Sequence, residues 1–545
     1  MADLNSGIET VHARFSETVS RYPDNPFLHI PLQATASYST SAIDFSYRQM
    51  QAEVEMLRQA YSTAGYGPGH RVALLLENRA EFFQHFFALN SLGVCVVPVN
   101  GDFVVEEIAY LLENSEVSVI VLLAEYLDKL SQALALTDRD ITSCRVDDIG
   151  RLPAAMPMGV AKAKTGASAD AAILYTSGTT GKPKGCVLSN EFFFCVGDWY
   201  LNIGGYCRLE NGVERLITPL PVVHTNALVW SMMAMIQSGG CVIQLDRFHS
   251  SSWWQTVRES KATCLHYLGV MPAMLLNLPQ SDEDLNGQIK FGLGAGVEPD
   301  LHARFEERFG FPLIEGWAMT ETGSGVCFMS EREPRHVGKR CMGRVLETME
   351  FRIVDKEGED VETGDVGELL VRRKGKNPRY GFFSEYYNNA EATSDAWEDG
   401  WFHTGDAVRQ DSENSVFFVE RLKNIIRRSG ENIAAAEVEA VLIEHPDIVN
   451  CAVSATADAI REEEVVASVI LHEGVDTNVE TAKQLVEYCL NKLSYFKAPG
   501  YVIFLEQLPV SATQKIQRGE LRKLVHDCME SGRYIDCRKQ KKKTN

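Results

Sequence analysis

Tyr175-Thr-Ser-Gly-Thr-Thr-Gly-Lys-Pro-Lys-Gly185 is a glycine-, threonine- and lysine-rich loop between two apolar segments. Glycines let backbone N–H groups turn inward, hydroxyls add donors and lysines add positive charge, so the loop is suited to hold a polyphosphate. It is not the P-loop of nucleoside triphosphatases, because Pro183 follows Lys182 where that motif needs Ser or Thr opening a helix. Cys186–Leu188 is predicted to be a strand, so the loop joins two strands.

Around this loop, strand-like apolar runs alternate with helical patterns, which predicts an α/β fold. Strands are predicted at Arg71–Leu76, Gly93–Pro98, Cys264–Leu268 and Ile289–Phe291, and helices at Glu81–Leu89 and between Pro299 and Gly310. Beyond Arg340 the strands become shorter, as in Met349–Val354 and Gly367–Val371, which indicates a β-rich subdomain. A compact α+β unit follows Arg421, with helices predicted around Glu437–Ile443 and Thr481–Leu493.

The length of 545 residues exceeds the usual size of a single core, so at least two domains are expected. We predict a large N-terminal domain over 1–420, with the β-rich subdomain at 340–420, and a small C-terminal domain over 424–530. Residues 421–423 are the predicted hinge between them. The tail 531–545, with the basic run Arg538-Lys-Gln-Lys-Lys-Lys543, is predicted to be solvated and disordered, with contact to an anionic surface or a longer substrate group as the alternative.

Composition narrows the class of protein. Apolar content of 45% and a mean hydropathy of -0.14 are typical of soluble globular chains, and no apolar run reaches the ~18 residues that span a bilayer. The N-terminus lacks the pattern of a secretory signal. Thirteen cysteines without a Cys-x-x-Cys pair indicate a reducing compartment, so we expect a cytoplasmic protein without a zinc site. A net charge of -21 disfavours nucleic acid as a partner.

The loop resembles the phosphate-binding signature of the adenylate-forming superfamily, which comprises acyl-CoA synthetases, free-standing adenylation domains and luciferases. The stretches around His224 and Gly343-Arg344 resemble the crotonobetaine/carnitine-CoA ligase-like members most. The resemblance implies a large domain that binds ATP and the acid, closed by a mobile C-terminal lid. It also implies that the phosphates are bound by Thr176, Ser177, Gly178, Thr179, Thr180, Gly181, Lys182 and Lys184.

Two further stretches match the family's adenine site. By resemblance, Gly316-Trp-Ala-Met-Thr-Glu-Thr-Gly323 places Trp317 against adenine, next to Glu315 and Gly316, with Thr320 on the phosphates and Glu321 on Mg²⁺. One carboxylate beside a phosphate loop suffices for magnesium, which otherwise takes phosphate and water. The run Gly294, Ala295 and Gly296 matches the adenine-binding turn. A Rossmann fingerprint fails there, because Val297 stands where a third glycine is required.

The second half of the chain supplies the other matches. Gly400-Trp-Phe-His-Thr-Gly-Asp406 places Asp406 on the ribose, with Arg421 beside it. Lys423 occupies the hinge position, although Asn424 stands where relatives have Asp. The loop at Gly430 corresponds to the channel for the pantetheine thiol. Lys515, within Leu508–Arg518, matches the catalytic lysine that neutralises charge as pyrophosphate leaves.

The residues of the acid pocket are likewise inferred from the family resemblance. Pro219–Asn226 resembles the segment that places His224 at the carboxylate and the thiol tunnel, where a plain core histidine is the alternative. Further pocket positions are Trp230, Gly269, Val270, Gly294 and Met319. A quaternary ammonium substrate would need an aromatic cage or a carboxylate, and Trp230 could supply one ring.

These matches predict an AMP-forming carboxylic acid–CoA ligase that uses ATP, Mg²⁺ and coenzyme A. The partners are then a small-molecule carboxylate and CoA, and a homodimer is compatible with the sequence. The alternative is a free-standing adenylation enzyme that loads an acyl group onto a carrier-protein phosphopantetheine. Luciferase chemistry has no supporting feature, and a non-catalytic relative is disfavoured by intact Thr179, Glu321, Asp406 and Lys515.

Overall fold

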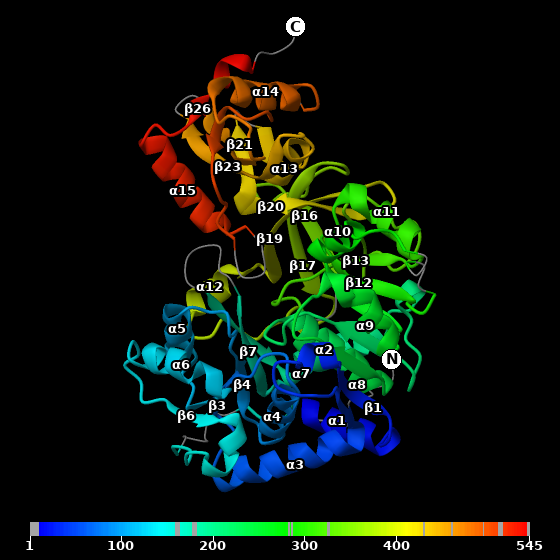
Figure 1. Ribbon diagram of the computed structural model, residues 1–545. Coiled ribbons are helices and arrows are strands. Elements are labelled where there is room, and N and C mark those ends of the chain that lie inside the picture. Colours follow the sequence, from blue (N-terminus) through cyan, green and yellow to red (C-terminus); the bar gives the residue numbers. More distant parts are fainter. Residues whose placement is uncertain are drawn as a thin grey trace.

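The computed structural model describes residues 10–157, 164–176, 183–281, 284, 287–323, 328–428, 431–458, 461–493, 495–510 and 516–541. The chain forms a large body that ends in a smaller C-terminal unit, drawn in orange and red at the top of Figure 1. Within the described ranges no helix is long and apolar enough to cross a membrane. The mixed α/β architecture with a small C-terminal unit is the fold class predicted from the sequence.

One sheet carries the two strands that flank the phosphate-type loop. Its order is β6-β5-β3-β4-β7-β8. The strands are β3 (Arg71–Leu75), β4 (Cys95–Pro98), β5 (Val119–Leu122), β6 (Thr142–Arg145), β7 (Asp170–Thr176) and β8 (Lys184–Ser189). Neighbouring strands run parallel except β7 and β8, which form an antiparallel pair with Thr176 opposite Lys184. The loop therefore joins two strands, as predicted, and its two ends lie side by side.

A second sheet is parallel in its first half. Its strands there are β9 (Arg215–Thr218), β10 (Cys241–Gln244), β11 (Cys264–Leu268), β12 (Phe291–Ala295) and β13 (Leu313–Trp317), with β1 (Pro26–Ile30) and β2 (Ile43–Ser46) at one edge. The strand predicted at Ile289–Phe291 lies later in the chain than expected. It is β12, which begins at Phe291 and continues through Gly292 and Gly294. Atoms of the neighbouring strands fill the space where a Cβ of either glycine would sit, so only glycine allows this strand to pack.

The same sheet continues beyond β13 as antiparallel strands. These are β14 (Phe328–Met329), β15 (Cys341–Val345), β16 (Met349–Val354), β17 (Val366–Arg373), β18 (Trp397–Glu398), β19 (Trp401–Gln410) and β20 (Val416–Arg421). The predicted strands at Met349–Val354 and Gly367–Val371 are confirmed as β16 and β17. In the β19–β20 pair, Asp406 lies opposite Arg421.

The helices of the large body connect these strands. They are α1 (Val11–Arg21), α2 (Leu32–Thr35), α3 (Tyr47–Thr63), α4 (Ala80–Ser91), α5 (Val105–Ser115), α6 (Leu127–Leu134), α7 (Asn190–Asn202), α8 (Met232–Ser238), α9 (Trp253–Glu259), α10 (Val270–Leu276), α11 (Pro299–Phe309) and α12 (Ala390–Asp395). α11 has Pro299 in its first turn and ends at Gly310, whose φ of 76° is the left-handed conformation that glycine adopts freely.

The C-terminal unit has a sheet of its own, in the order β22-β21-β24-β25-β26 with β23 on β24. Its strands are β21 (Ile425–Arg428), β22 (Glu431–Ala434), β23 (Ile448–Asp458), β24 (Glu462–Leu471), β25 (Tyr501–Phe504) and β26 (Ile535–Asp536). Its helices are α13 (Ala435–Ile443), α14 (Val479–Leu490) and α15 (Arg518–Glu530). The largest apolar core reaches from Val11 to Val416, and a separate core begins at Ile426.

The prediction of a disordered tail from residue 531 is wrong for residues 531–541. β26 pairs with β25, Cys537 is buried, and the Lys541 side chain is 1% exposed. The described C-terminal fold therefore extends past residue 530 to residue 541, because a buried carboxylate supplies the partner that a lysine needs in the interior. Residues 542–545 lie outside the described part of the chain.

Candidate active site

The flanks of the phosphate-type loop are held from both sides. Residues 177–182 lie outside the described part of the chain, so the structure places only Thr176 and Lys184 of the predicted phosphate ligands. Lys184 Nζ lies 4.7 Å from the ring centre of Tyr386, a cation–π distance. Tyr110 Oη donates to Pro183 O at 3.0 Å. The described ends of the loop are therefore anchored.

Tyr386 connects this loop to the predicted magnesium ligand. Its hydroxyl donates to Glu321 Oε1 at 2.7 Å, and Glu321 is 6% exposed. The segment that carries Tyr386 pairs with β8, where Tyr387 N donates to Gly185 O at 2.7 Å. Burial, followed by the neighbouring Glu321 carboxylate, raises the pKa of Tyr386, so the phenol stays protonated and donates. Sequence reasoning missed Tyr386, since no motif marks it.

Asp406, Trp317 and Arg421, the three residues predicted to contact the nucleoside, are joined by direct contacts. Trp317 Nε1 donates to Asp406 Oδ2 at 2.8 Å, and Arg421 Nε lies 2.8 Å from Asp406 Oδ1. Oδ1 nevertheless accepts no well-aligned hydrogen bond from the described protein, although it is fully buried. A buried carboxylate oxygen with unused lone pairs is a suitable acceptor for a ribose hydroxyl.

The Trp317 ring has a second role that the sequence did not reveal. The residue is 6% exposed, and the indole packs edge-on against Phe328 at 6.0 Å. With the hydrogen bond to Asp406, this packing makes Trp317 a support for the carboxylate as well as the predicted neighbour of adenine. Burial raises the pKa of Asp406 to about 6, against the opposing effect of Arg421.

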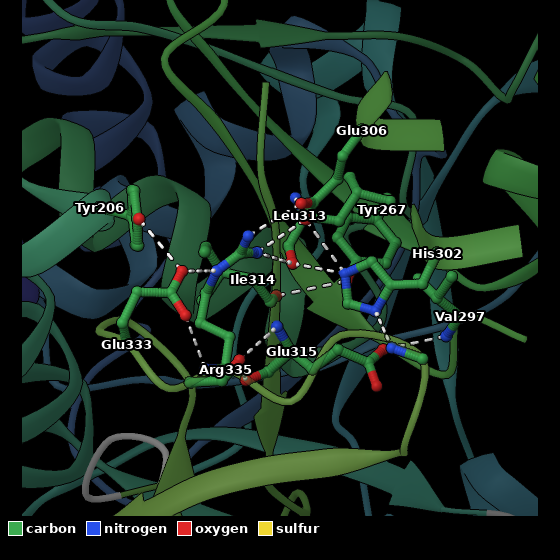
Figure 2. Close-up of polar contacts among 12 residues, drawn as sticks. Tyr206, Tyr267, Val297, His302, Glu306, Leu313, Ile314, Glu315, Glu333 and Arg335 are labelled. Carbon is green, nitrogen blue, oxygen red and sulfur yellow. Dashed lines mark hydrogen bonds and ion pairs between the residues drawn. The ribbon is translucent and has the colours of Figure 1, made fainter. Parts of the chain in front are cut away.

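The predicted adenine turn is built by close backbone contacts. A Cβ on Gly269 would lie 1.6 Å from Gly296 O, so the start of α10 packs directly on the turn. The buried Glu315 carboxylate accepts from Val297 N at 2.9 Å, a contact drawn as a dashed line in Figure 2. Burial raises the pKa of Glu315. The structure thus places Gly269, Gly294, Gly296 and Glu315 close together.

A largely buried network of charged side chains lies near Glu315 and Val297 (Figure 2). Arg335 binds the Glu306 carboxylate through Nη1 at 2.6 Å and Nη2 at 2.8 Å. His302 Nε2 lies 3.2 Å from Glu306 Oε1 and 3.0 Å from Leu313 O on β13. Burial raises the pKa of Glu306, but hydrogen bonds from Arg335 and then His302 bring it down to about 2. The pair stays charged at neutral pH and fixes α11 against β13.

Two of the residues predicted for the acid pocket, His224 and Trp230, lie at a short stretch with π-helical hydrogen bonding, Asn226–Ser231, which begins two residues after His224. His224 is exposed, which excludes the core-histidine alternative. Trp230, on this stretch, packs against Trp199 of α7 with ring centres 5.7 Å apart. Sequence reasoning missed Trp199, because its partner lies on another element. Wide helical turns of this kind occur often at functional sites.

A neutral histidine holds the π-helical stretch in place. His266 Nδ1 lies 2.7 Å from Asn226 Oδ1, and its Nε2 lies 2.8 Å from Tyr200 Oη. Burial lowers the pKa of His266 to about 3, so the ring is neutral. These partners are consistent with an N–H on Nδ1 that donates to Asn226 and an Nε2 that accepts from Tyr200.

The remaining predicted residues differ in how exposed they are and in whether the structure describes them. Val270 is 49% exposed at the start of α10, while Met319 and Thr320 are partly buried beside Glu321. Gly430 and Lys515 lie outside the described residues, and so does the side chain of Lys423. No group of three or more His, Cys, Asp or Glu side chains in the described ranges is arranged to hold a metal.

Comparison with known families gives two matches along the chain. Residues 15–387 match the model of the AMP-binding enzyme family, and residues 437–515 match the AMP-binding enzyme C-terminal domain. Among curated proteins, the chain is 30% identical over 500 residues to crotonobetaine/carnitine–CoA ligase of Citrobacter koseri. That alignment covers 88% of this chain and 93% of the relative. The Escherichia coli K12 enzyme of the same name is 30% identical over 503 residues, with the same coverage.

Solved structures share the fold. o-Succinylbenzoate CoA synthetase from Bacillus subtilis, in complex with its acyl-adenylate intermediate, superposes with a TM-score of 0.77 at 24% identity, over 93% of this chain and 97% of that one. ATP-bound MatB from Rhodopseudomonas palustris superposes with a TM-score of 0.77 at 22% identity, over 94% of this chain and 99% of that one. The chain therefore belongs to the AMP-binding enzyme family and is an AMP-forming acid–thiol ligase, as its motifs predicted.

Proposed function

We propose that the protein ligates a small carboxylic acid to coenzyme A, with ATP and Mg²⁺ as co-substrate and metal. The observation that carries the nucleotide part is Asp406, whose buried Oδ1 lies beside Arg421 without a well-aligned hydrogen bond. A ribose hydroxyl would satisfy that oxygen. The curated relatives at 30% identity are CoA ligases by name, which favours coenzyme A as the acceptor.

Magnesium fits the residues present. Glu321 offers a nearly buried carboxylate that Tyr386 orients from one side, next to the strand that carries Lys184. Magnesium is commonly held by one or two carboxylates together with substrate phosphates and water. Bound there, it would neutralise phosphate charge. Glu321 would hold it, while Thr320 and the loop residues Thr176–Lys184 would orient the phosphates.

In the reaction we propose, the protein contributes positioning and charge. The substrate carboxylate attacks the α-phosphorus of ATP, the bond to the β-phosphate oxygen breaks, and pyrophosphate leaves with the electron pair. Lys515 would neutralise the charge that develops there. The thiolate of coenzyme A then attacks the acyl carbon, guided past His224 and the Gly430 loop, and AMP leaves. Orientation of the reacting groups supplies much of the rate enhancement in such transfers.

For the acid, we propose a short carboxylate that carries a quaternary ammonium group. Trp199 and Trp230 form an indole pair with ring planes at 58°, and Trp199 also lies 5.4 Å from the ring of Tyr200. Indole faces attract quaternary ammonium groups, which cannot donate hydrogen bonds. The named substrates of the curated relatives, crotonobetaine and carnitine, have this chemistry.

We expect Trp199→Leu to raise the KM for crotonobetaine about 10-fold, since a cation–π contact contributes about 0.5–2 kcal/mol. The matched substrate is 5,5-dimethylhex-2-enoate, in which a carbon replaces the ammonium nitrogen and removes the charge. Wild-type enzyme should prefer crotonobetaine, and the variant should lose that preference without a change in the KM for ATP. An unchanged ratio of kcat/KM for the two acids would exclude Trp199 from the cation site.

The function itself is tested by AMP release from ATP·Mg²⁺ with a panel of acids, with and without coenzyme A. The panel contains carnitine, crotonobetaine, short and medium fatty acids and aryl acids, and thioesters are identified by mass. AMP and thioester that appear only with coenzyme A and one acid would establish the ligase and its substrate. Acyl-adenylate that forms but does not react with coenzyme A would favour the alternative acceptor, a carrier-protein phosphopantetheine.

A further inference from the structure

The basic end of the chain folds back onto the C-terminal sheet. β26 pairs with β25, with Ile535 opposite Val502, and Cys537 N donates to Gly500 O at 2.9 Å. A short 3-10 turn, Arg538–Gln540, follows and leads into Lys541. Figure 1 shows this red segment beside α14 in the C-terminal unit.

Lys541 belongs to a buried cluster of three charges. Its Nζ donates to Glu464 Oε1 at 2.5 Å, and Arg428 Nε lies 2.9 Å from both oxygens of the same carboxylate. The side chains of Lys541, Glu464 and Arg428 are 1%, 0% and 6% exposed. Charged groups persist at such burial only when they are paired and hydrogen-bonded, so the three side chains depend on one another.

The surrounding backbone leaves room for this cluster and forms hydrogen bonds with it. A Cβ on Gly500 would lie 2.5 Å from the carboxyl carbon of Glu464, so only glycine leaves room for the carboxylate. Val465 N donates to Glu464 Oε1 at 3.0 Å, and Lys541 Nζ also donates to Phe496 O at 3.3 Å. The site is therefore built from β21, β24, the residues just before β25 and the terminal segment together.

Arg428 connects the buried cluster to the hairpin that β21 and β22 form. It is the last residue of β21, lies opposite Glu431 of β22, and faces Glu462 of the neighbouring β24. The two residues that join β21 to β22 lie outside the described part of the chain. In the proposed function, one of them, Gly430, contributes to the path of the thiol. The buried cluster thus holds the base of this hairpin.

We propose that Lys541 is a positioning residue for the thiol-transfer half-reaction. It orients Glu464, which holds Arg428 and so fixes β21 and β22, the two strands that flank the residues proposed to border the path of the thiol. This inference rests on the proposed function, because it assumes that the acceptor thiol passes this hairpin. Formation of the acyl-adenylate uses ATP and the acid and does not involve the thiol, so the two half-reactions should respond differently.

The test compares Lys541→Met with Lys539→Met, which changes an exposed lysine two residues away. Acyl-adenylate formation is measured by ATP–pyrophosphate exchange, and thiol transfer by single turnover of preformed acyl-adenylate with coenzyme A. We expect Lys541→Met to raise the KM for coenzyme A at least 10-fold while exchange stays within about 2-fold, as expected for a lost charged hydrogen bond. Lys539→Met should leave both half-reactions unchanged.

Lys541→Gln retains an N–H donor for Glu464, so it should keep the fold and recover part of the coenzyme A affinity. Equal losses in both half-reactions for either variant, or no loss in either, would overturn the proposal. Amide hydrogen exchange over residues 425–434 gives a readout without coenzyme A, and it should rise in Lys541→Met but not in Lys539→Met. If wild-type enzyme makes no CoA thioester, the acceptor assignment fails, and unchanged exchange at the hairpin would separately reject the role of Lys541.

Discussion

Lys515→Ala should lower the rate of acyl-adenylate formation about 10²–10³-fold, the usual cost of removing one charge-stabilising group from an active site. The described residues on either side of this lysine are well anchored. Val510 and Ile516 form an antiparallel bridge across residues 511–515, and Gln517 N donates to Pro509 O at 2.8 Å. Arg518, at the start of α15, binds both oxygens of Glu439. The substitution should therefore leave the C-terminal unit folded.

The informative comparison is between half-reactions. Lys515→Ala should fail in ATP–pyrophosphate exchange with the acid, yet convert chemically prepared acyl-adenylate and coenzyme A to thioester within a few-fold of wild type. Lys523→Ala is the matched control, since Lys523 lies on α15 with a 73% exposed side chain. A Lys515→Ala variant that exchanges pyrophosphate at the wild-type rate would remove this lysine from the catalytic assignment.

Asp406→Asn should raise the KM for ATP about 10- to 100-fold, because hydrogen bonds to a charged acceptor contribute about 1.5–3 kcal/mol. The amide oxygen of the asparagine can still accept from Trp317. Its NH2 group, however, replaces the second carboxylate oxygen, so the ribose loses its anionic acceptor. Asp365→Asn is the control, because Asp365 is an exposed residue in the same β-rich subdomain. A KM for ATP unchanged by Asp406→Asn would exclude the ribose contact.

The same carboxylate predicts how ATP use depends on pH. Burial raises the pKa of Asp406 to about 6 from an ordinary value of 3.8. In the free enzyme it is ionised above pH 6 and becomes protonated as the pH falls through 6, so kcat/KM for ATP should fall below that pH. Asp406→Asn should abolish this fall. Rate measurements from pH 5 to 8 at saturating acid and coenzyme A test the expectation.

As the pH rises, the stability of the folded protein should change in the opposite direction to its affinity for ATP. Because the folded-state pKa is raised, the native protein binds more protons than the unfolded chain between pH 3.8 and 6, and stability falls as the pH rises through this window. Above it, the ionised carboxylate lowers the free energy of unfolding by about 3 kcal/mol. ATP-free Asp406→Asn should therefore melt above the wild-type Tm at pH 7, and the difference should shrink towards pH 4.

The parts of the site predicted from sequence are those whose residues are close together in the chain. Trp317 and Glu321 are separated by four positions, and Asp406 closes a seven-residue run, so local patterns identify them. Strands β11, β16 and β17 and helix α11 were predicted for the same reason, since apolar periodicity and a Pro–Gly pair are local signals.

Tertiary structure alone decided which side chains support those residues. Tyr386 lies 65 positions from Glu321, Trp199 lies on a different helix from Trp230, and Lys541 pairs with a carboxylate 77 positions earlier. The basic run 538–543 has the composition of a solvated tail, but Lys541 pairs with the buried Glu464 and Arg538 pairs with Asp458 and Asp536, which explains why its first part is folded. The sequence by itself determined the family and its chemistry, because reacting groups need particular residue types at short spacing. The supporting partners depended on the fold, because a hydrogen bond or a packed ring requires only proximity in space.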